Sequence, residues 1–427
     1  MARGGMRRSV SVLVAGGILL PALTALSQEV TTDVGGKAPP RLVFSLKTGV
    51  NSDTNRSLSL TGSDPATTLD TNAGLTYATR TRDEAFTASV GGLLRFGDTG
   101  KGAGGGSGLQ EPQAKVDYGF DNGDTSLSLG AYYRKSQVSL LEPLTLASGG
   151  LSPGDLVATT GSVVSSGAHL GIEARKRAAV GVLANLGFDR RHYLDNTNPA
   201  VFDSRTVSAS TGLRFHLDAA RQLDVTLGYS AQTYDNAART QTDSRQLGLA
   251  YSQTMRDGAI SALLQIGHDN LCGRNVLQVG RTLALSPDIT IAAQGGLSIR
   301  PGTGVQPVGS LKFAMKGQTD TLEAALTRQV TLDSTNTQIS YTSLSLGYTH
   351  RLSPVSNLGL NVSASQASGG SASGVDRQNL TAAYTYQVTP DWSLNTGYTY
   401  RHLNSSSGRA TSNAVFFSIG RSFTLLP

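Results

Sequence analysis

The chain is poor in cysteine and in charge. Its 427 residues include one cysteine, Cys272, so no intramolecular disulfide can form. Cys272 lies in a predicted short loop, His268–Arg274, where an incidental thiol is the expected interpretation rather than a redox site. Charged residues make up 15% and hydrophobic residues 38% of the chain, a low apolar content for a soluble globular protein. No basic run interleaved with aromatic side chains occurs, which argues against nucleic-acid binding.

Long apolar runs are also lacking after the first 27 residues, so any membrane residence must come from strands rather than helices. The first 27 residues have the three parts of a Sec signal peptide: Arg3, Arg7 and Arg8, the apolar run Val10–Leu26, and the small cleavage-site residues Ala25 and Ser27. Without these three arginines the formal charge falls from +6 to +3. The predicted organisation is a signal peptide over 1–27, a short periplasmic segment over 28–40 and one domain over 41–427.

What the chain does contain is period-two alternation, seen most clearly in Asn379–Leu403. Apolar and polar residues alternate there on both sides of the break Thr389-Pro390-Asp391. Such alternation predicts a β-strand with two different faces, and Pro with Asp favours a tight turn. The apolar face carries a tryptophan and several tyrosines, as membrane strands do near the interface: Leu380, Ala382, Tyr384, Tyr386, Val388, Trp392, Leu394, Tyr398 and Tyr400.

The same hairpin recurs from about Arg41 to the end of the chain. Tight turns alternate strictly with looser polar connections, which gives about 20 strands, within a range of 18 to 22. This predicts an all-β fold, a transmembrane antiparallel up-and-down β-barrel with short periplasmic turns and longer outer loops. Over Arg41–Phe423 the chain resembles large, porin-like Gram-negative outer-membrane β-barrels in general.

The predicted last strand, Ser412–Phe423, carries Val415, Phe417, Ile419 and Phe423 on one face. It resembles the C-terminal signal by which outer-membrane barrels engage the barrel assembly machinery. Two departures are Thr424–Pro427, which follow the final aromatic residue, and Arg421, which falls on the apolar face. Arg421 is expected to snorkel at the periplasmic rim.

Motifs for catalysis, cofactors or metals are not found, so an enzyme is not expected. Ser107, Ser371 and Ser373 do not form a nucleophile elbow, and the six histidines lack paired metal-ligand spacing. Asn51–Asn55 has the alternate oxygens of a calcium loop, but Arg56 replaces the glycine that such a loop needs. We therefore expect a polar loop there, with no metal and no cofactor.

The alternate positions that carry the polar residues of each predicted strand (the polar parity) are expected to face the lumen. They hold nine basic and five acidic residues, which are the candidate pore-lining set: Lys47, Arg95, Lys115, Asp117, Arg134, Glu173, Arg175, Asp189, Arg191, Arg214, Asp224, Arg300, Lys312 and Glu323. Two interpretations are open. These residues pair across strands and keep the lumen wet, or they make a modestly anion-favouring pore.

Width and loops favour a restricted channel. Barrels of 16 to 18 strands leave an aqueous channel, and Gln28–Pro40 is too short for a plug domain. The longest connection, Gln137–Thr160, corresponds to the third outer loop, which general porins fold inward. This connection lacks the acidic tip of the porin loop, and an exposed loop is an equal alternative. Its leucines are the candidate constriction residues: Leu140, Leu141, Leu144, Leu146, Leu151 and Leu156.

The resulting hypothesis is a passive porin-type channel for small polar solutes in the Gram-negative outer membrane, with both termini periplasmic. Its expected partners are membrane lipid and lipopolysaccharide. A second hypothesis is export or biogenesis of a surface polysaccharide (exopolysaccharide), and a third is a structural or adhesive barrel.

Overall fold

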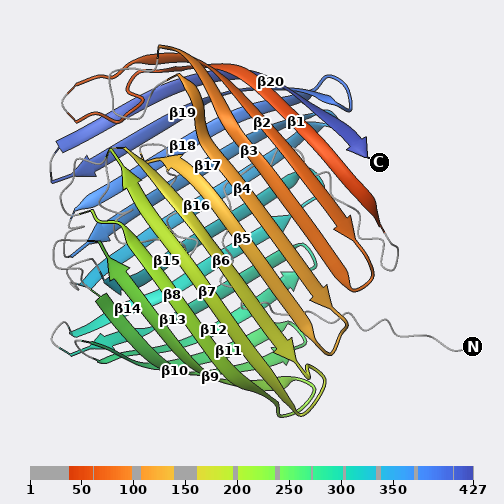
Figure 1. The fold of residues 1–427 in the computed structure, drawn as a ribbon, viewed down its shortest axis with the longest axis vertical. Helices are drawn as coiled ribbons and strands as arrows, with labels where there is room; N and C mark the ends of the chain where they lie inside the picture. The colour runs from red at the N-terminus through yellow and green to blue at the C-terminus, as the bar shows by residue number, and fades with distance from the viewer. Residues whose placement is uncertain are drawn as a thin grey trace, which may run out of the picture.

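The computed structural model describes residues 38–60, 62–98, 107–138, 161–195, 201–235, 241–270, 273–301, 304–332, 338–369, 374–406 and 408–426. Within them, twenty strands form a single antiparallel sheet. The first strand, β1, pairs with both β2 and the last strand, β20, so the sheet closes on itself (Figure 1). The predicted fold class and the strand count of 20 are confirmed. None of these residues forms a helix long and apolar enough to cross a membrane.

The strands range from 12 to 19 residues. Their bounds are β1 Ala38–Asp53, β2 Ala66–Arg80, β3 Glu84–Asp98, β4 Gly108–Asp121, β5 Ser126–Gln137, β6 Ser162–Ala174, β7 Val180–Leu194, β8 Ser204–His216, β9 Arg221–Tyr234, β10 Gln241–Met255, β11 Gly258–Asp269, β12 Gly273–Ser286, β13 Ile289–Arg300, β14 Gly304–Lys316, β15 Asp320–Leu332, β16 Gln338–Ser353, β17 Ser356–Ser368, β18 Val375–Gln387, β19 Trp392–Ser405 and β20 Gly408–Leu426.

The two ends of the barrel differ in their connections. At the short-turn end, every hairpin closes through two to five residues, as at 256–257 and 175–179. At the long-loop end the connections are more varied, and they include 54–65 and 138–161 but also 406–407. The expectation of longer loops throughout this end was therefore too simple, because β19 and β20 continue in register almost to their connection. Outer-membrane barrels as a rule have their short turns on the periplasmic side, which is the orientation predicted here.

Alternation along each strand separates an outer and an inner face. On β3, Val90, Leu94 and Phe96 are large apolar side chains that remain exposed, whereas Leu93 and Arg95 between them are buried. On β18 and β19 the exposed side chains include Tyr384, Tyr386 and Tyr398, all of the predicted apolar parity. In a closed barrel the exposed apolar parity must face outward and the other parity must face the lumen.

The last strand is longer than the sequence indicated. It continues past Phe423, and Leu426 still pairs with Leu42 of β1, so the residues after the final aromatic belong to the seam of the barrel. Arg421 lies on the outer face at the short-turn end. Its guanidinium carbon is 5.0 Å from the centroid of the Trp392 ring and 4.4 Å from that of Phe423. Cation–π attraction to both rings stabilises the charge at the edge of the apolar belt.

Candidate functional site: the lumen and its long-loop mouth

The fourteen charged residues predicted to line the pore do not all lie on the wall. Thirteen are in strands with the parity of the inner face, whereas Arg175 lies in the turn after β6, with a φ of 58°. Positive φ is uncommon outside glycine and is accommodated here by the turn. The inward side is therefore charged, and whether these residues line a conducting pore stays a prediction.

Arg214 organises the charges on β6, β8 and β9. Its Nε and Nη2 donate to the two carboxylate oxygens of Asp224, each at 3.0 Å, and its Nη1 donates to Glu173. This Arg214 cluster (Glu173, Arg214 and Asp224) is half-buried, with 18–26% of each side chain exposed. Bidentate pairing fixes the guanidinium on the wall, so the cluster leaves one excess negative charge facing the lumen.

Other residues of the predicted pore-lining set on neighbouring strands also form ion pairs or hydrogen bonds. Lys115 and Asp117 form an ion pair along β4, 2.7 Å between Nζ and Oδ2. On β5 and β7, the Tyr132 hydroxyl donates to Asp189 at 2.6 Å, and Arg191 donates to Ser165 Oγ at 3.2 Å. Local pairing therefore accounts for several of the lumen charges, as the first of the two sequence-based interpretations expects.

Lys312 and Glu323 behave differently. They lie on the inner faces of β14 and β15, both are exposed, and neither forms an ion pair with the described residues. An unpaired charge remains in a wall only where water solvates it. The inner wall at β14 and β15 is therefore hydrated.

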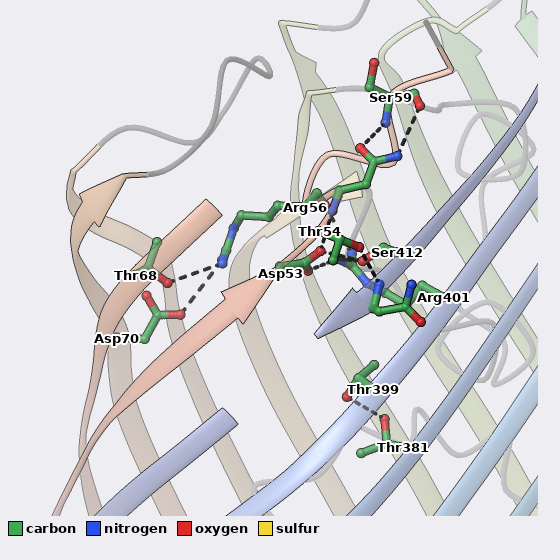
Figure 2. A network of polar contacts seen from close by, with 12 residues as sticks. Asp53, Thr54, Arg56, Ser59, Thr68, Asp70, Thr381, Thr399, Arg401 and Ser412 are labelled. Carbon is green, nitrogen blue, oxygen red and sulfur yellow. Dashed lines mark hydrogen bonds and ion pairs between the residues drawn. The ribbon is translucent and has the colours of Figure 1, made fainter. Parts of the chain in front are cut away.

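At the long-loop end, by contrast, a buried polar network joins the first strand to the last two. Ser412 Oγ of β20 donates to Asp53 Oδ1 of β1 at 2.5 Å, and Arg401 Nη2 of β19 donates to Ser412 Oγ at 3.0 Å and to Asp53 Oδ2. We call these three residues the seam network (Figure 2). The Arg401 and Asp53 side chains are only 8% and 2% exposed. The network therefore lies where the barrel closes, and it is largely dry.

The β1–β2 connection extends this network across the inner wall. Arg56 points away from Arg401, toward Thr68 and Asp70 of β2 (Figure 2), with Nη1 3.4 Å from Thr68 Oγ1 and Nη2 3.8 Å from Asp70 Oδ2. Asp70 also accepts from Arg95 Nε at 2.9 Å. Burial lowers the pKa of Arg56, the charge of Arg95 adds to this, and Asp70 opposes it. Two arginines thus share one carboxylate.

Apolar contacts hold the same connection inward. Leu58 has a φ of 51° and is buried in a cluster with Val375, Leu403 and Ala410, with Leu60 packed alongside. These partners belong to the inner faces of β18, β19 and β20. The first connection therefore covers part of the lumen wall at the long-loop mouth. This role was not predicted, although Leu58 and Leu60 in an otherwise polar stretch were a usable signal.

The third connection had been the predicted constriction. Leu140, Leu141, Leu144, Leu146, Leu151 and Leu156 lie outside the described residues. Its first residue, Val138, is completely buried, and its carbonyl accepts from Arg377 Nη1 at 3.3 Å. Arg377 is on β18, which is not a neighbour of β5 in the sheet, so this contact crosses the mouth. Arg274 of β12 reaches the Val330 carbonyl of β15 in a similar way, at 2.9 Å.

In the described part of the chain, no three His, Cys, Asp or Glu residues are grouped to hold a metal ion. Asp53, which the sequence placed in a calcium-like stretch, is bound by Arg401 and Ser412 instead. Cys272 lies outside the described residues.

Comparison with known proteins bears on the architecture alone. At the level of sequence, no protein-family model and no curated protein matches the chain. Solved structures do match. A mutant of the ferric enterobactin receptor PfeA from Pseudomonas aeruginosa has a TM-score of 0.53 at 10% identity, covering 91% of this chain and 81% of that one. The barrel of this chain is therefore similar in fold to the barrel of that receptor.

Two further structures agree. The siderophore receptor PirA from Pseudomonas aeruginosa has a TM-score of 0.50 at 11% identity, covering 90% of this chain and 80% of that one. The FrpB iron transporter from Neisseria meningitidis has a TM-score of 0.50 at 10% identity, covering 91% and 83%. At such identities the likeness concerns the barrel and carries no ligand to this chain.

Proposed function

We propose that the protein is a passive channel of the Gram-negative outer membrane that lets small polar solutes diffuse through its lumen. The observation that carries the proposal is that Lys312 and Glu323 of the inner wall are exposed and form no ion pair with the described residues, so water must solvate them. A barrel of 20 strands is wider than those of 16 to 18 strands that already leave an aqueous channel. No enzymatic step and no cofactor is part of the proposal.

The chemistry of the wall suggests the class of solute. The Arg214 cluster and the Lys115–Asp117 pair neutralise much of their own charge. On β16 to β19 the inner face carries many hydroxyl and amide side chains, among them Ser343, Ser365, Thr381 and Thr399, and Thr381 is 3.1 Å from Thr399 between their hydroxyl oxygens. Such a wall suits uncharged hydrogen-bonding solutes such as sugars, with weak preference between ions.

The long-loop mouth sets the size limit in this proposal. The β1–β2 connection and the Arg377–Val138 contact both narrow the lumen there, whereas the exposed charges of β14 and β15 mark the hydrated wall. A wide barrel with a narrow mouth excludes large solutes while it keeps a wet interior.

Planar-bilayer conductance and liposome swelling test the proposal. The purified full-length protein is expected to give ohmic, weakly selective current, and liposomes containing it should swell faster in small sugars than in large ones. Heat-modifiable migration on a gel verifies that the barrel is folded in each sample. Folded protein that gives neither current nor swelling would contradict the channel function and would favour a structural or adhesive barrel.

A second candidate, polysaccharide export, is favoured by the same hydroxyl-rich wall on β16 to β19, because hydroxyl groups bind sugar chains along their length. It predicts that a long polysaccharide blocks the current, whereas a simple channel is blocked only weakly. PfeA is a ferric enterobactin receptor, PirA a siderophore receptor and FrpB an iron transporter. A siderophore-receptor role for this chain predicts tight binding of a ferric siderophore. Tight siderophore binding would overturn the channel proposal.

A further inference from the structure

The outer face of the barrel carries an unusual pair of like charges on β7 and β8. Arg190 and Arg205 are directly opposite each other in the register of these two strands. Both side chains are exposed, and neither forms an ion pair with any described residue. Directly opposed side chains on a sheet have Cβ atoms about 4.5–5.5 Å apart, and like charges at that spacing repel. Such a pair is stable where an anion lies between the two cations.

The pair lies at the edge of the apolar belt. On β7 the outward residues before Arg190 are Leu186 and Phe188, 55% and 40% exposed, and on β8 Val207 is 48% exposed beside Arg205. Both arginines come next along their strands toward the long-loop end. This places the two guanidinium groups where hydrocarbon gives way to headgroups, in the leaflet that faces the long loops.

The surroundings of the pair offer little competing negative charge. On the two flanking strands, Ser166 of β6 lies opposite Arg190, and Thr233 of β9 lies opposite Arg205. Asp189 precedes Arg190 but has the parity of the inner face, where it accepts from Tyr132. Asp203, just before β8, shares the outer parity of Arg205, and it already binds the His192 ring and accepts from the Tyr193 amide at 2.8 Å. Hydroxyl groups on either side of two cations are additional donors for an oxyanion.

Other cations of the outer face are arranged differently. Arg245 of β10 is also exposed and without an ion pair among the described residues, but Tyr229 and His268 lie opposite it rather than another arginine. Arg281 of β12 also faces outward, near the short-turn end, but its Nη2 is 2.9 Å from Asp257 Oδ2. Arg421 lies near the Trp392 and Phe423 rings. Among the described residues, Arg190 and Arg205 have neither kind of partner.

We infer that Arg190 and Arg205 form a binding site for a phosphate of the glycolipid in the outer leaflet, the phosphorylated lipid anchor of lipopolysaccharide. Arginine is suited to this role because its fork binds phosphate oxygens in pairs, and an oxyanion between two guanidinium groups turns their repulsion into attraction. Adjacent exposed Leu186, Phe188 and Val207 contact the acyl chains. The inference depends on the membrane location of the barrel and not on conduction.

The experiment measures glycolipid binding by the purified full-length protein in detergent, using native mass spectrometry. Bisphosphorylated lipid A is compared with dephosphorylated lipid A and with inorganic phosphate. The wild-type protein should bind the bisphosphorylated form at least 10-fold more tightly than the dephosphorylated form. The double variant R190Q/R205Q should lose at least 10-fold in affinity for the first and show no change for the second. Arg281→Gln is the matched control and should bind like the wild type.

Stability gives an independent readout that a merely structural role would not reproduce. Without glycolipid, Arg205→Gln should raise the heat-modification temperature, because it removes the repulsion. With bisphosphorylated lipid A, the wild type should become the more stable of the two. R190K/R205K keeps both charges and should retain part of the binding, which guards against misfolding of the Gln variants. Equal binding of both lipid A forms, or saturation by inorganic phosphate alone, would overturn the inference.

Discussion

The seam network and the Arg214 cluster are two arrangements of the same chemistry in different solvents. Each holds one arginine against a carboxylate on the inner wall, Arg401 with Asp53 and Arg214 with Asp224. The first pair is 8% and 2% exposed, and the second is 21% and 18% exposed. Removing one partner from a dry pair leaves a buried uncompensated charge, whereas water replaces much of what a wet pair loses. Solvent access, more than geometry, therefore decides how much each contact matters.

The largest effect should come from Asp53→Ala. It leaves Arg401 buried without its carboxylate, which costs about 3–5 kcal/mol in comparable buried pairs. The unfolding temperature in detergent, followed by heat-modifiable gel migration, should fall clearly. Ser412→Ala removes two hydrogen bonds from the same network but leaves the Arg401–Asp53 ion pair in place, and should cost less, about 1–3 kcal/mol. Equal effects of the two variants would show that the network is wetter than its burial indicates.

Leu58→Ala should have the next largest effect. It opens a gap between the β1–β2 connection and β18 to β20, and a buried leucine truncated to alanine typically costs about 2–5 kcal/mol. Because the connection narrows the mouth, single-channel conductance should rise in the same variant. Leu217→Ala, at a turn residue that is 56% exposed, is the control and should change neither quantity. An unchanged conductance would remove the β1–β2 connection from the proposed constriction.

Arg214→Gln tests the partly exposed Arg214 cluster. The half-buried cluster is partly solvated and should lose less stability than the seam network, about 1–2 kcal/mol. Glu173 and Asp224 are left facing the lumen, so the reversal potential should shift toward cations. Lys312→Gln makes the same change in charge at an exposed residue without an ion pair among the described residues, and should shift the potential with no loss of stability. If Arg214→Gln destabilises the barrel as strongly as Asp53→Ala, the distinction between dry and wet pairs fails.

The smallest effect should come from Asp218, in the exposed turn between β8 and β9. The Arg221 side chain donates to its carboxylate, followed by the Ala220 amide, and this holds the pKa of Asp218 below the ordinary aspartate value of 3.8. A lowered folded-state pKa contributes stability above the unfolded pKa, which is lost as the pH falls through the folded value. Asp218→Asn should therefore be slightly less stable than the wild type at pH 6, with the difference vanishing near pH 2. Thermal unfolding at the two pH values measures this, and a difference that grows with acid would reverse the assignment.

How much the sequence could predict depended on the distance over which each feature is encoded. Strand faces and turns follow from neighbouring residues, so the Thr389-Pro390-Asp391 turn and the outward Tyr384 and Tyr386 were predictable, and with them the strand count. The pairing of Asp53 with Arg401 is not encoded locally, because it depends on which strands meet at closure. The path of the β1–β2 connection was missed because Arg56 and Leu58 looked like loop residues. Arg56 is buried against Thr68 and Asp70 of β2, and Leu58 is buried against β18, β19 and β20.

The outcome for the lumen charges was intermediate. Parity alone placed Arg214 and Asp224 on the polar side, and their spacing on adjacent strands allowed pairing. Parity also selected Arg175, which the fold places in a turn, since alternation cannot show where a strand ends. For Arg190 and Arg205 nothing in the sequence indicated that they face each other, because that depends on the exact register of β7 and β8.

The seam network also bears on how fast the barrel opens. Asp53 is separated by 348 residues from Arg401 and by 359 from Ser412. These contacts form only when the two ends of the sheet meet, after nearly all of the chain has been placed. Interactions absent from the folding transition state leave the folding rate almost unchanged and slow unfolding instead. The seam network therefore lengthens the lifetime of the folded barrel. Its loss should increase the unfolding rate, beginning with separation of β1 from β20.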